Sequence, residues 1–255
     1  MLQSAIHTDL YIDFLENPMQ ALKAVLFGAI GTIAETSDLQ RQSFNAAFLD
    51  AGLDWHWSPD TYRQLLQTNG GQERLRAYRS ADPSRHHVTD AVIEHMHTLK
   101  THRYADLVAQ GGLQPRPGVA KLVSLCLAAG VKLAWCTSTS QSNVSSIQLA
   151  LAGQLPFEQF DCVVTIDKIG RVKPSPDAYL YALNKLGVSA DQAVAIEDAP
   201  VSISAAKAAG IFCIATPGAT TQEQDFSNAD CVVPDLLGMD ITQLNKLLES
   251  KTSLA

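Results

Sequence analysis

The chain has 255 residues, of which 46% are hydrophobic, and its formal net charge is −7. This length suits one large domain or a core with a smaller inserted domain. The negative charge argues against nucleic acid, and against an anionic membrane surface, as the main partner. The five cysteines are scattered and no apolar stretch reaches transmembrane length, so we expect a cytoplasmic protein with reduced thiols and no membrane partner.

The first predicted element is a strand over residues 22–27. It follows an N-terminal extension, residues 1–20, of mixed and weakly helical character to which the sequence assigns no role. The short apolar run is typical of a buried parallel strand, and it leads into a tight turn over residues 28–32. Open α/β sheets bind their ligands at this end of their strands, so the turn is the first candidate for a site.

A different kind of segment follows, over residues 36–111. It contains no β-type run, and an apolar stripe of Phe44, Ala47 and Phe48 marks its first helix. Glycines at 111–112 and a Pro-Arg-Pro-Gly turn at 115–118 are candidate hinges at its end. The pattern predicts a helical cap inserted into the core, with helices over Leu39–Ala51, Pro59–Thr68, Gln72–Ser80 and Val88–Ala109.

Strands and helices alternate through the rest of the chain. The predicted strands cover Lys132–Thr137, Asp161–Thr165, Ala193–Glu197, Ile211–Ala215 and Asp230–Val233. The predicted helices cover Val119–Ala129, Pro176–Leu186 and Ser202–Ala209, and a glycine follows each of them, as at many helix ends. Alternation of this kind is typical of an α/β fold with a doubly wound parallel sheet. We expect residues 21–35 and 112–255 to form this core.

Polar residues with chemical potential follow the predicted strands. Thr137 and Ser138 lie at the end of one strand, and Glu197 and Asp198 lie at the end of another. Lys173 lies in the stretch Lys-Pro-Ser-Pro-Asp-Ala-Tyr between them. Together with Ala-Ala-Lys-Ala-Ala-Gly after Glu-Asp, this order of motifs resembles the haloacid dehalogenase superfamily, whose core is a Rossmann-like α/β fold. The resemblance covers residues 22–235.

Short stretches of the cap narrow the resemblance to one branch. The sequences Ala34-Glu35-Thr36, Gly70-Gly71-Gln72-Glu73-Arg74 and Arg116-Pro117-Gly118 are similar to the CbbY-like branch, whose members are phosphatases of sugar bisphosphates. β-Phosphoglucomutase is a more distant relative with the same cap type. Gln72 stands where the branch usually has a lysine.

The resemblance implies a specific loss at the turn after the first strand. Family members carry Asp-x-Asp-Gly-Thr there, and their first aspartate attacks phosphorus and ligates Mg²⁺, while the second is the general acid and base. Here Gly28 and Ile30 occupy the two aspartate positions, beside Gly31 and Thr32. The alternative is that Gly28 is simply a glycine required by the backbone of the turn.

The resemblance also implies roles for the remaining candidates. Thr137, Ser138 and Lys173 would hold a phosphoryl group, and Asp198 and Glu197 would bind Mg²⁺ weakly. Lys173 has the alternative of pairing with one of these two carboxylates. Contacts with substrate or cap are implied for four residues: Glu35, Glu73, Arg74 and Arg116. Two of these have alternatives, since Glu35 could act as a replacement nucleophile or base and Arg116 could be an ordinary loop arginine.

Two functions follow from these residues. The first is a pseudoenzyme that binds or senses a small phosphorylated metabolite, because covalent catalysis needs a nucleophile and proton transfer needs a titratable group. The alternative is an active Mg²⁺-dependent phosphatase or hydrolase with an atypical nucleophile or a metal-bound water.

Three further features favour structural roles. We interpret the cap histidines as part of a solvated surface rather than a metal site, because His95 and His97 face different sides of a helix. Trp55 and Trp57 read as packing anchors of the cap. Cys136, beside Thr137, reads as a core strand residue, with a reactive thiol as the alternative.

Overall fold

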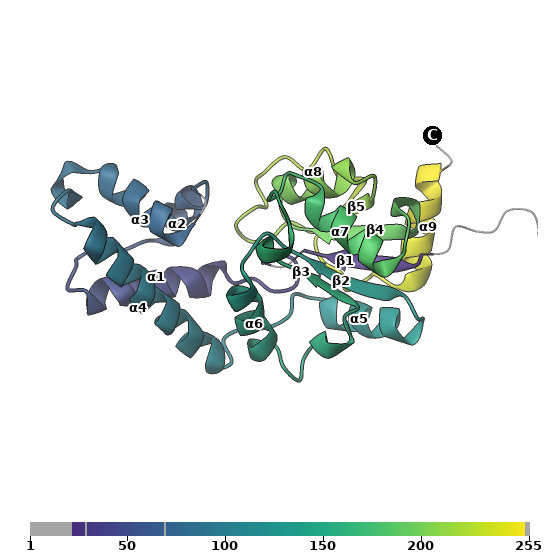
Figure 1. The fold of residues 1–255 in the computed structure, drawn as a ribbon, viewed down its shortest axis with the longest axis horizontal. Helices are drawn as coiled ribbons and strands as arrows, with labels where there is room; N and C mark the ends of the chain where they lie inside the picture. Colours follow the sequence, from purple (N-terminus) through teal and green to yellow (C-terminus); the bar gives the residue numbers. More distant parts are fainter. Residues whose placement is uncertain (1–21, 29, 69, 253–255) are drawn as a thin grey trace, which may run out of the picture.

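The computed structural model describes residues 22–28, 30–68 and 70–252. A group of helices lies to one side of a larger part built on a sheet, and the two parts are joined at the ends of α1 and α4 (Figure 1). The predicted N-terminal extension, residues 1–20, lies outside the described residues. No helix in the described part is both long and apolar enough to span a membrane.

The larger part contains a fully parallel sheet with the strand order β3-β2-β1-β4-β5-β6. The central strand β1 pairs with β2 on one side and β4 on the other, so Leu26 lies between Ala134 and Ala195. All four residues of β1 are buried, as expected for a parallel strand covered on both faces. The strands are β1 (Ala24–Phe27), β2 (Lys132–Cys136), β3 (Cys162–Val164), β4 (Ala193–Glu197), β5 (Phe212–Ala215) and β6 (Cys231–Val232).

Helices cover both faces of the sheet. Apolar residues of α5 (Val119–Ala128), α6 (Gln141–Ala150) and α9 (Ile241–Thr252) pack in one buried cluster with Phe27 and Trp135 of the sheet. The other face packs against α7 (Asp177–Leu186) and α8 (Pro200–Ala208) through a cluster rich in alanine. The doubly wound α/β fold predicted from the alternation of strands and helices is therefore confirmed.

The helical part has a hydrophobic core of its own. Its helices are α1 (Ser37–Asp50), α2 (Pro59–Leu65), α3 (Gly71–Ser80) and α4 (Asp90–Ala109). Phe44 and Phe48 of α1 pack with Trp55 and Trp57, whose rings lie within 4.5–5.6 Å of them between centroids. The two tryptophans are buried anchors, as predicted. We call residues 36–111 the cap; the division of the chain at these boundaries stays a prediction.

The observed elements lie within a few residues of the predicted ones, and two helices were not predicted. These are α6 and α9, and α4 starts at Asp90 rather than Val88. Short 3-10 helices complete the described elements: η1 (Pro83–Arg85), η2 (Phe157–Gln159), η3 (Ile166–Lys168) and η4 (Ala190–Gln192).

Candidate functional site

The carboxyl ends of β1, β2 and β4 bring the predicted polar residues to one edge of the sheet. Gly28 directly follows β1, Thr137 follows β2, and Glu197 is the last residue of β4. Lys173 reaches the same edge from the loop between η3 and α7, where its ammonium group meets Glu197. Parallel strands place their carboxyl ends side by side, so residues up to 170 positions apart in sequence form one site.

Glu197 is the centre of a buried hydrogen-bonded cluster. Its Oε1 atom lies 2.5 Å from Nζ of Lys173 and also accepts the hydroxyl proton of Tyr179. The side chain of Glu197 is 1% exposed and that of Lys173 is 9% exposed. Burial, together with the negative charge of Glu197, raises the pKa of Tyr179 well above its ordinary value. One carboxylate and one ammonium group therefore neutralise each other out of contact with water.

The side chain of Glu197 also fills the space beside Gly28. A Cβ atom on Gly28 would lie 2.7 Å from Cδ of Glu197 and 2.5 Å from Oγ1 of Thr32, and it would overlap Oε2 of Glu197. The φ angle of Gly28 is not positive, so an unusual backbone conformation does not explain why a glycine stands here. The absence of a side chain at this position is required by what packs against it.

Asp198 is the second buried carboxyl group of the site. Its Oδ1 atom accepts a hydrogen bond of 2.8 Å from Oγ1 of Thr32, and its main-chain oxygen accepts one of 2.6 Å from Thr221. Burial raises the pKa of Asp198 to about 7, and the neighbouring charge of Glu197 acts in the same direction. Near neutral pH this group therefore exists in both protonation states.

The residues at this edge do not fit a divalent cation. Mg²⁺ is held through oxygen ligands, usually one or two carboxylates. Oε1 of Glu197 is bound by Lys173 and Tyr179, Oδ1 of Asp198 is bound by Thr32, and β1 contributes no carboxylate. Across the described residues, no group of three or more His, Cys, Asp or Glu side chains is placed so that it could hold a metal ion. The weak Mg²⁺ site predicted at Asp198 and Glu197 lacks the ligand set of a metal centre.

The two hydroxyl groups after β2 are oriented by the backbone. Oγ of Ser138 accepts the N–H of Lys173 at 3.1 Å, and Oγ1 of Thr137 accepts the N–H of Thr139 at 3.0 Å. Each hydroxyl uses its oxygen as acceptor and keeps its own proton to donate. This arrangement suits an oxyanion, and the role of the two residues in binding phosphate stays a prediction.

Arg116 forms hydrogen bonds with the loops around the site. Its guanidinium group donates to the main-chain oxygens of Thr216 at 2.6 Å and Pro217 at 2.8 Å, and also to that of Gly31. These contacts favour the loop role over direct contact with a ligand. Glu35 accepts the N–H of Ser37 with one carboxylate oxygen, while its other oxygen is buried and finds no hydrogen-bond partner within the described part of the chain.

A cavity of about 410 Å³ lies between the cap and the core. Arg74, His97 and Lys100 of the cap line one side of it, and Thr139 and Ser140 are among the polar residues on the core side. Nε of Arg74 is buried and has no hydrogen-bond partner among the described residues. Burial lowers the pKa of Lys100 to about 8, and the charge of Arg74 lowers it further. The cavity wall therefore carries positive charge in a protein with a net charge of −7.

The cap histidines differ in their exposure to solvent, and Glu73 pairs with a neighbouring arginine. His86, His87, His95 and His102 are exposed, as predicted, but the solvated assignment is wrong for His97, which is half-buried because it packs against Gly71. Glu73 is exposed and pairs with Arg76 at 2.5 Å, so its carboxylate neutralises Arg76 rather than Arg74.

A second cavity, of about 900 Å³, also has Ile30 in its wall. Asp198, Ser204 and Thr221 of the core line it with Arg63 and Gln67 of the cap. Ile30 contributes to the walls of both cavities. One of the residues that the two cavities share is therefore aliphatic and has no titratable group.

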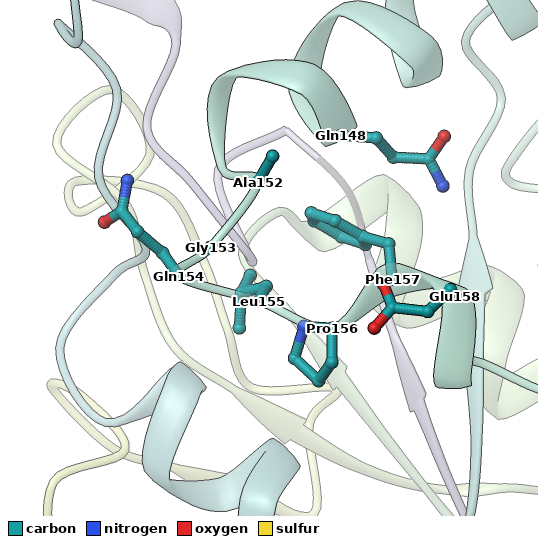
Figure 2. A pocket seen from close by; sticks show the side chains of 8 residues that line it. All are labelled: Gln148, Ala152, Gly153, Gln154, Leu155, Pro156, Phe157 and Glu158. Carbon is teal, nitrogen blue, oxygen red and sulfur yellow. The ribbon is translucent and has the colours of Figure 1, made fainter.

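The described residues that line a third cavity include no cation and no hydroxyl group. Figure 2 shows it after the end of α6, with Leu155 between Gln154 and the rings of Pro156 and Phe157. Its only ionisable lining residue is Glu158. This loop leads into the amino end of β3, so the cavity is at the opposite edge of the sheet from the site.

Comparison with known proteins decides the family. A model of the haloacid dehalogenase-like hydrolases matches residues 22–210. The chain belongs to this family. It is also 39% identical over 218 residues to protein CbbY of Rhodobacter capsulatus, a match that covers 84% of this chain and 94% of the relative, and 38% identical over 230 residues to protein CbbY of Cereibacter sphaeroides, covering 87% and 98%. The CbbY resemblance predicted from the cap motifs is confirmed.

Solved CbbY structures share the fold. A CbbY mutant from Rhodobacter sphaeroides in complex with xylulose-1,5-bisphosphate superposes with a TM-score of 0.73 at 38% identity, covering 85% of this chain and 95% of that one. CbbY from the same organism in complex with phosphate gives a TM-score of 0.71 at 37% identity, with the same coverage. Small phosphorylated ligands are thus seen in these two CbbY structures.

Several residues of this CbbY-family site were missed by reasoning from the sequence. Tyr179 lies in the Lys173 motif, but its hydroxyl contact with Glu197 has no sequence signal of its own. Lys100 was not singled out in the sequence, and His97 was counted among the solvated cap histidines; both lie on α4. Their spacing of three residues, which puts them on one side of α4, was the available signal.

Proposed function

We propose that this haloacid dehalogenase-like protein binds a small phosphorylated metabolite between its cap and core and does not hydrolyse it through an aspartyl-phosphate. The observation that carries the proposal is the carboxylate of Glu197 in the space beside Gly28. A nucleophile on β1 is absent, and its volume is occupied by a group that is itself tied to Lys173 and Tyr179.

The loss of chemistry follows from residue types. Gly28 has no atom that attacks phosphorus, and Ile30 cannot carry a proton. Removing a nucleophile that works together with its acid and base lowers the rate on the order of 10⁶-fold. The absence of a ligand set for Mg²⁺ supports the same proposal, because the cation would otherwise neutralise a bound phosphate.

Retained binding is supported by the polar walls. Arg74 and Lys100 face a cavity of about 410 Å³, within the usual size range of small-molecule sites. Phosphate recognition by paired cations and hydroxyl donors needs no nucleophile. The phosphorylated ligands in the two CbbY structures support the choice of ligand class.

The test measures turnover and binding on the same full-length protein. We expect phosphate release from sugar phosphates, xylulose-1,5-bisphosphate included, to equal the buffer blank with and without Mg²⁺. We also expect a sugar phosphate to raise the melting temperature in EDTA. Mg²⁺-dependent release above the blank would overturn the loss of catalysis, and no stabilisation by any sugar phosphate would overturn the binding role.

A second candidate function is hydrolysis by a water molecule activated at Asp198. The observation in its favour is the pKa of about 7 for a carboxyl group that lines the 900 Å³ cavity. A general base near neutral pH has this property. This function predicts phosphate release in wild-type protein that Asp198→Asn abolishes, with Ser204→Ala, on the same cavity wall, as the control that retains it.

A further inference from the structure

The candidate site has a core end, at Lys173, and a cap end, at Arg74 and Lys100. The two ends differ in whether their cations have a counter-ion. At the core end, Lys173 is matched by Glu197 at 2.5 Å in a cluster closed by Tyr179. A phosphate dianion added there would meet the buried carboxyl groups of Glu197 and Asp198 with no metal between them. Removing Lys173 from Glu197 would leave a buried carboxylate unpaired, which is strongly unfavourable.

The cap end has the opposite imbalance. In the described part of the chain, neither Arg74 nor Lys100 forms an ion pair, whereas the nearby Arg76 and Arg79 pair with Glu73 and Asp90. Lys100 lies 5.1 Å from the ring centroid of Phe44 and 5.2 Å from that of Tyr104, contacts that only partly offset its burial.

The two cap cations also repel each other. Burial lowers the pKa of Lys100, and the charge of Arg74 lowers it further. Burial likewise lowers the pKa of His97, with a smaller contribution from the charge of Lys100. An anion placed among the three groups would remove this repulsion and would give Nε of Arg74 the acceptor that it lacks. The groups that line this end are therefore arranged for an anion that no described residue supplies.

We infer that the protein holds its ligand by a single phosphoryl group at the cap end, through Arg74 and Lys100, while Lys173 stays committed to Glu197. This inference rests on the proposed function and names its ligand class, a sugar monophosphate or a metabolite of that chemistry. The uncharged part of the ligand faces the hydroxyl groups of Thr139 and Ser140 on the core side of the cavity. A second phosphoryl group adds no affinity, because the described residues that line the cavity offer it no further unpaired cation.

The test compares three related probes by isothermal titration in EDTA: xylulose, xylulose 5-phosphate and xylulose-1,5-bisphosphate. With the wild-type full chain we expect no measurable binding of xylulose and affinities within about threefold for the two phosphates. A bisphosphate that binds more than tenfold tighter than the monophosphate would overturn the inference, while leaving the proposed function intact. No binding of either phosphate would overturn the proposed function as well.

Variants at each end of the site determine where the phosphoryl group binds. Lys100→Met or Arg74→Gln should weaken xylulose 5-phosphate ten- to a hundredfold, the usual effect of removing a charge-assisted hydrogen bond. The exposed Lys121→Met is the matched control and should change nothing. The double variant Lys173→Met with Glu197→Gln removes the core pair without leaving a charge unpaired, and we expect it to bind within threefold of wild type. Loss of binding in this double variant, with Lys100→Met unaffected, would place the phosphate at the core end and overturn the inference.

Discussion

The carboxylate of Glu197 occupies the volume that a side chain on Gly28 would need. A Cβ on Gly28 would lie 2.7 Å from the carboxylate carbon of Glu197. Glu197 cannot swing away freely, because Lys173, Tyr179 and Thr32 hold its two oxygens. The contact therefore links the identity of a residue after β1 to the conformation of a residue at the end of β4.

Gly28→Ala should destabilise the protein by about 1–3 kcal/mol, the usual cost of overpacking a well-packed site. Chemical denaturation followed by circular dichroism measures the free energy of unfolding. Gly238→Ala is the matched control, because no atom lies within 4 Å of its added Cβ and its φ is not positive. Equal stability of the two variants would show that Glu197 moves aside at no cost.

Asp198→Asn should change how stability depends on pH. The pKa of Asp198 in the folded protein, about 7, lies above its ordinary value, so between about pH 4 and 7 the folded state binds a proton that the unfolded state releases. The free energy of unfolding of the wild type therefore falls as pH rises through this window. Three pKa units correspond to roughly 4 kcal/mol at most.

The asparagine keeps an acceptor for Thr32 and has no proton to lose. We expect the variant to gain stability over wild type from pH 4 to 7 and to hold that advantage at pH 8, measured by denaturant titration at each pH. Parallel pH profiles for the two proteins would contradict this account.

Ala199→Ser should stabilise α8. Ala199 is the N-cap of this helix, with the extended backbone (φ −136°, ψ 142°) that an N-cap residue adopts, yet no side chain caps the helix. A serine there accepts a free N–H of the first turn and is worth about 1 kcal/mol. Differential scanning calorimetry should show a higher melting temperature, whereas Ala199→Val, which adds size without an acceptor, should not.

The affinity for xylulose 5-phosphate should be highest between roughly pH 6 and 8. Below about pH 6 the phosphate loses its second negative charge. Above about pH 8 Lys100 loses its proton, since burial and Arg74 lower its pKa. Tyr62, Tyr104 and His97 also face this cavity, and the pKa values of the two tyrosines are raised above this range.

Titration calorimetry at pH 7 and pH 9 measures the alkaline limb. We expect weaker binding at pH 9 in the wild type and little difference between the two pH values in Lys100→Met. A wild-type affinity that is flat from pH 7 to 9 would mean that Lys100 does not contact the phosphate.

The fold was predictable where local chemistry and tertiary packing agree. The strand at 132–136 is a short apolar run, and glycines at 130, 187 and 210 mark the ends of the helices before them. The helix α6 was missed because Gln141–Ala150 is rich in serine and buries only Val144 and Ile147. Its amphipathic stripe is too narrow to stand out in the sequence.

The candidate site was predictable in its members but not in their pairing. Strand ends and motif order brought Lys173 and Glu197 to one edge of the sheet, and the sequence left their pairing as one of two alternatives. The position of the Glu197 side chain beside Gly28 depends on rotamers and on Tyr179, which no local pattern encodes. Arg74 and Lys100 meet only because α3 and α4 pack together in the cap.

The exclusion between Gly28 and Glu197 also bears on the evolutionary history open to this chain. An acid introduced at position 28 alone collides with Glu197, and removing the carboxylate of Glu197 alone leaves Lys173 buried without its counter-ion. Either single change passes through a less stable protein, and selection acts against such intermediates. Gaining an acid after β1 therefore takes two changes with a less stable intermediate, and this instability favours keeping the present pair of residues.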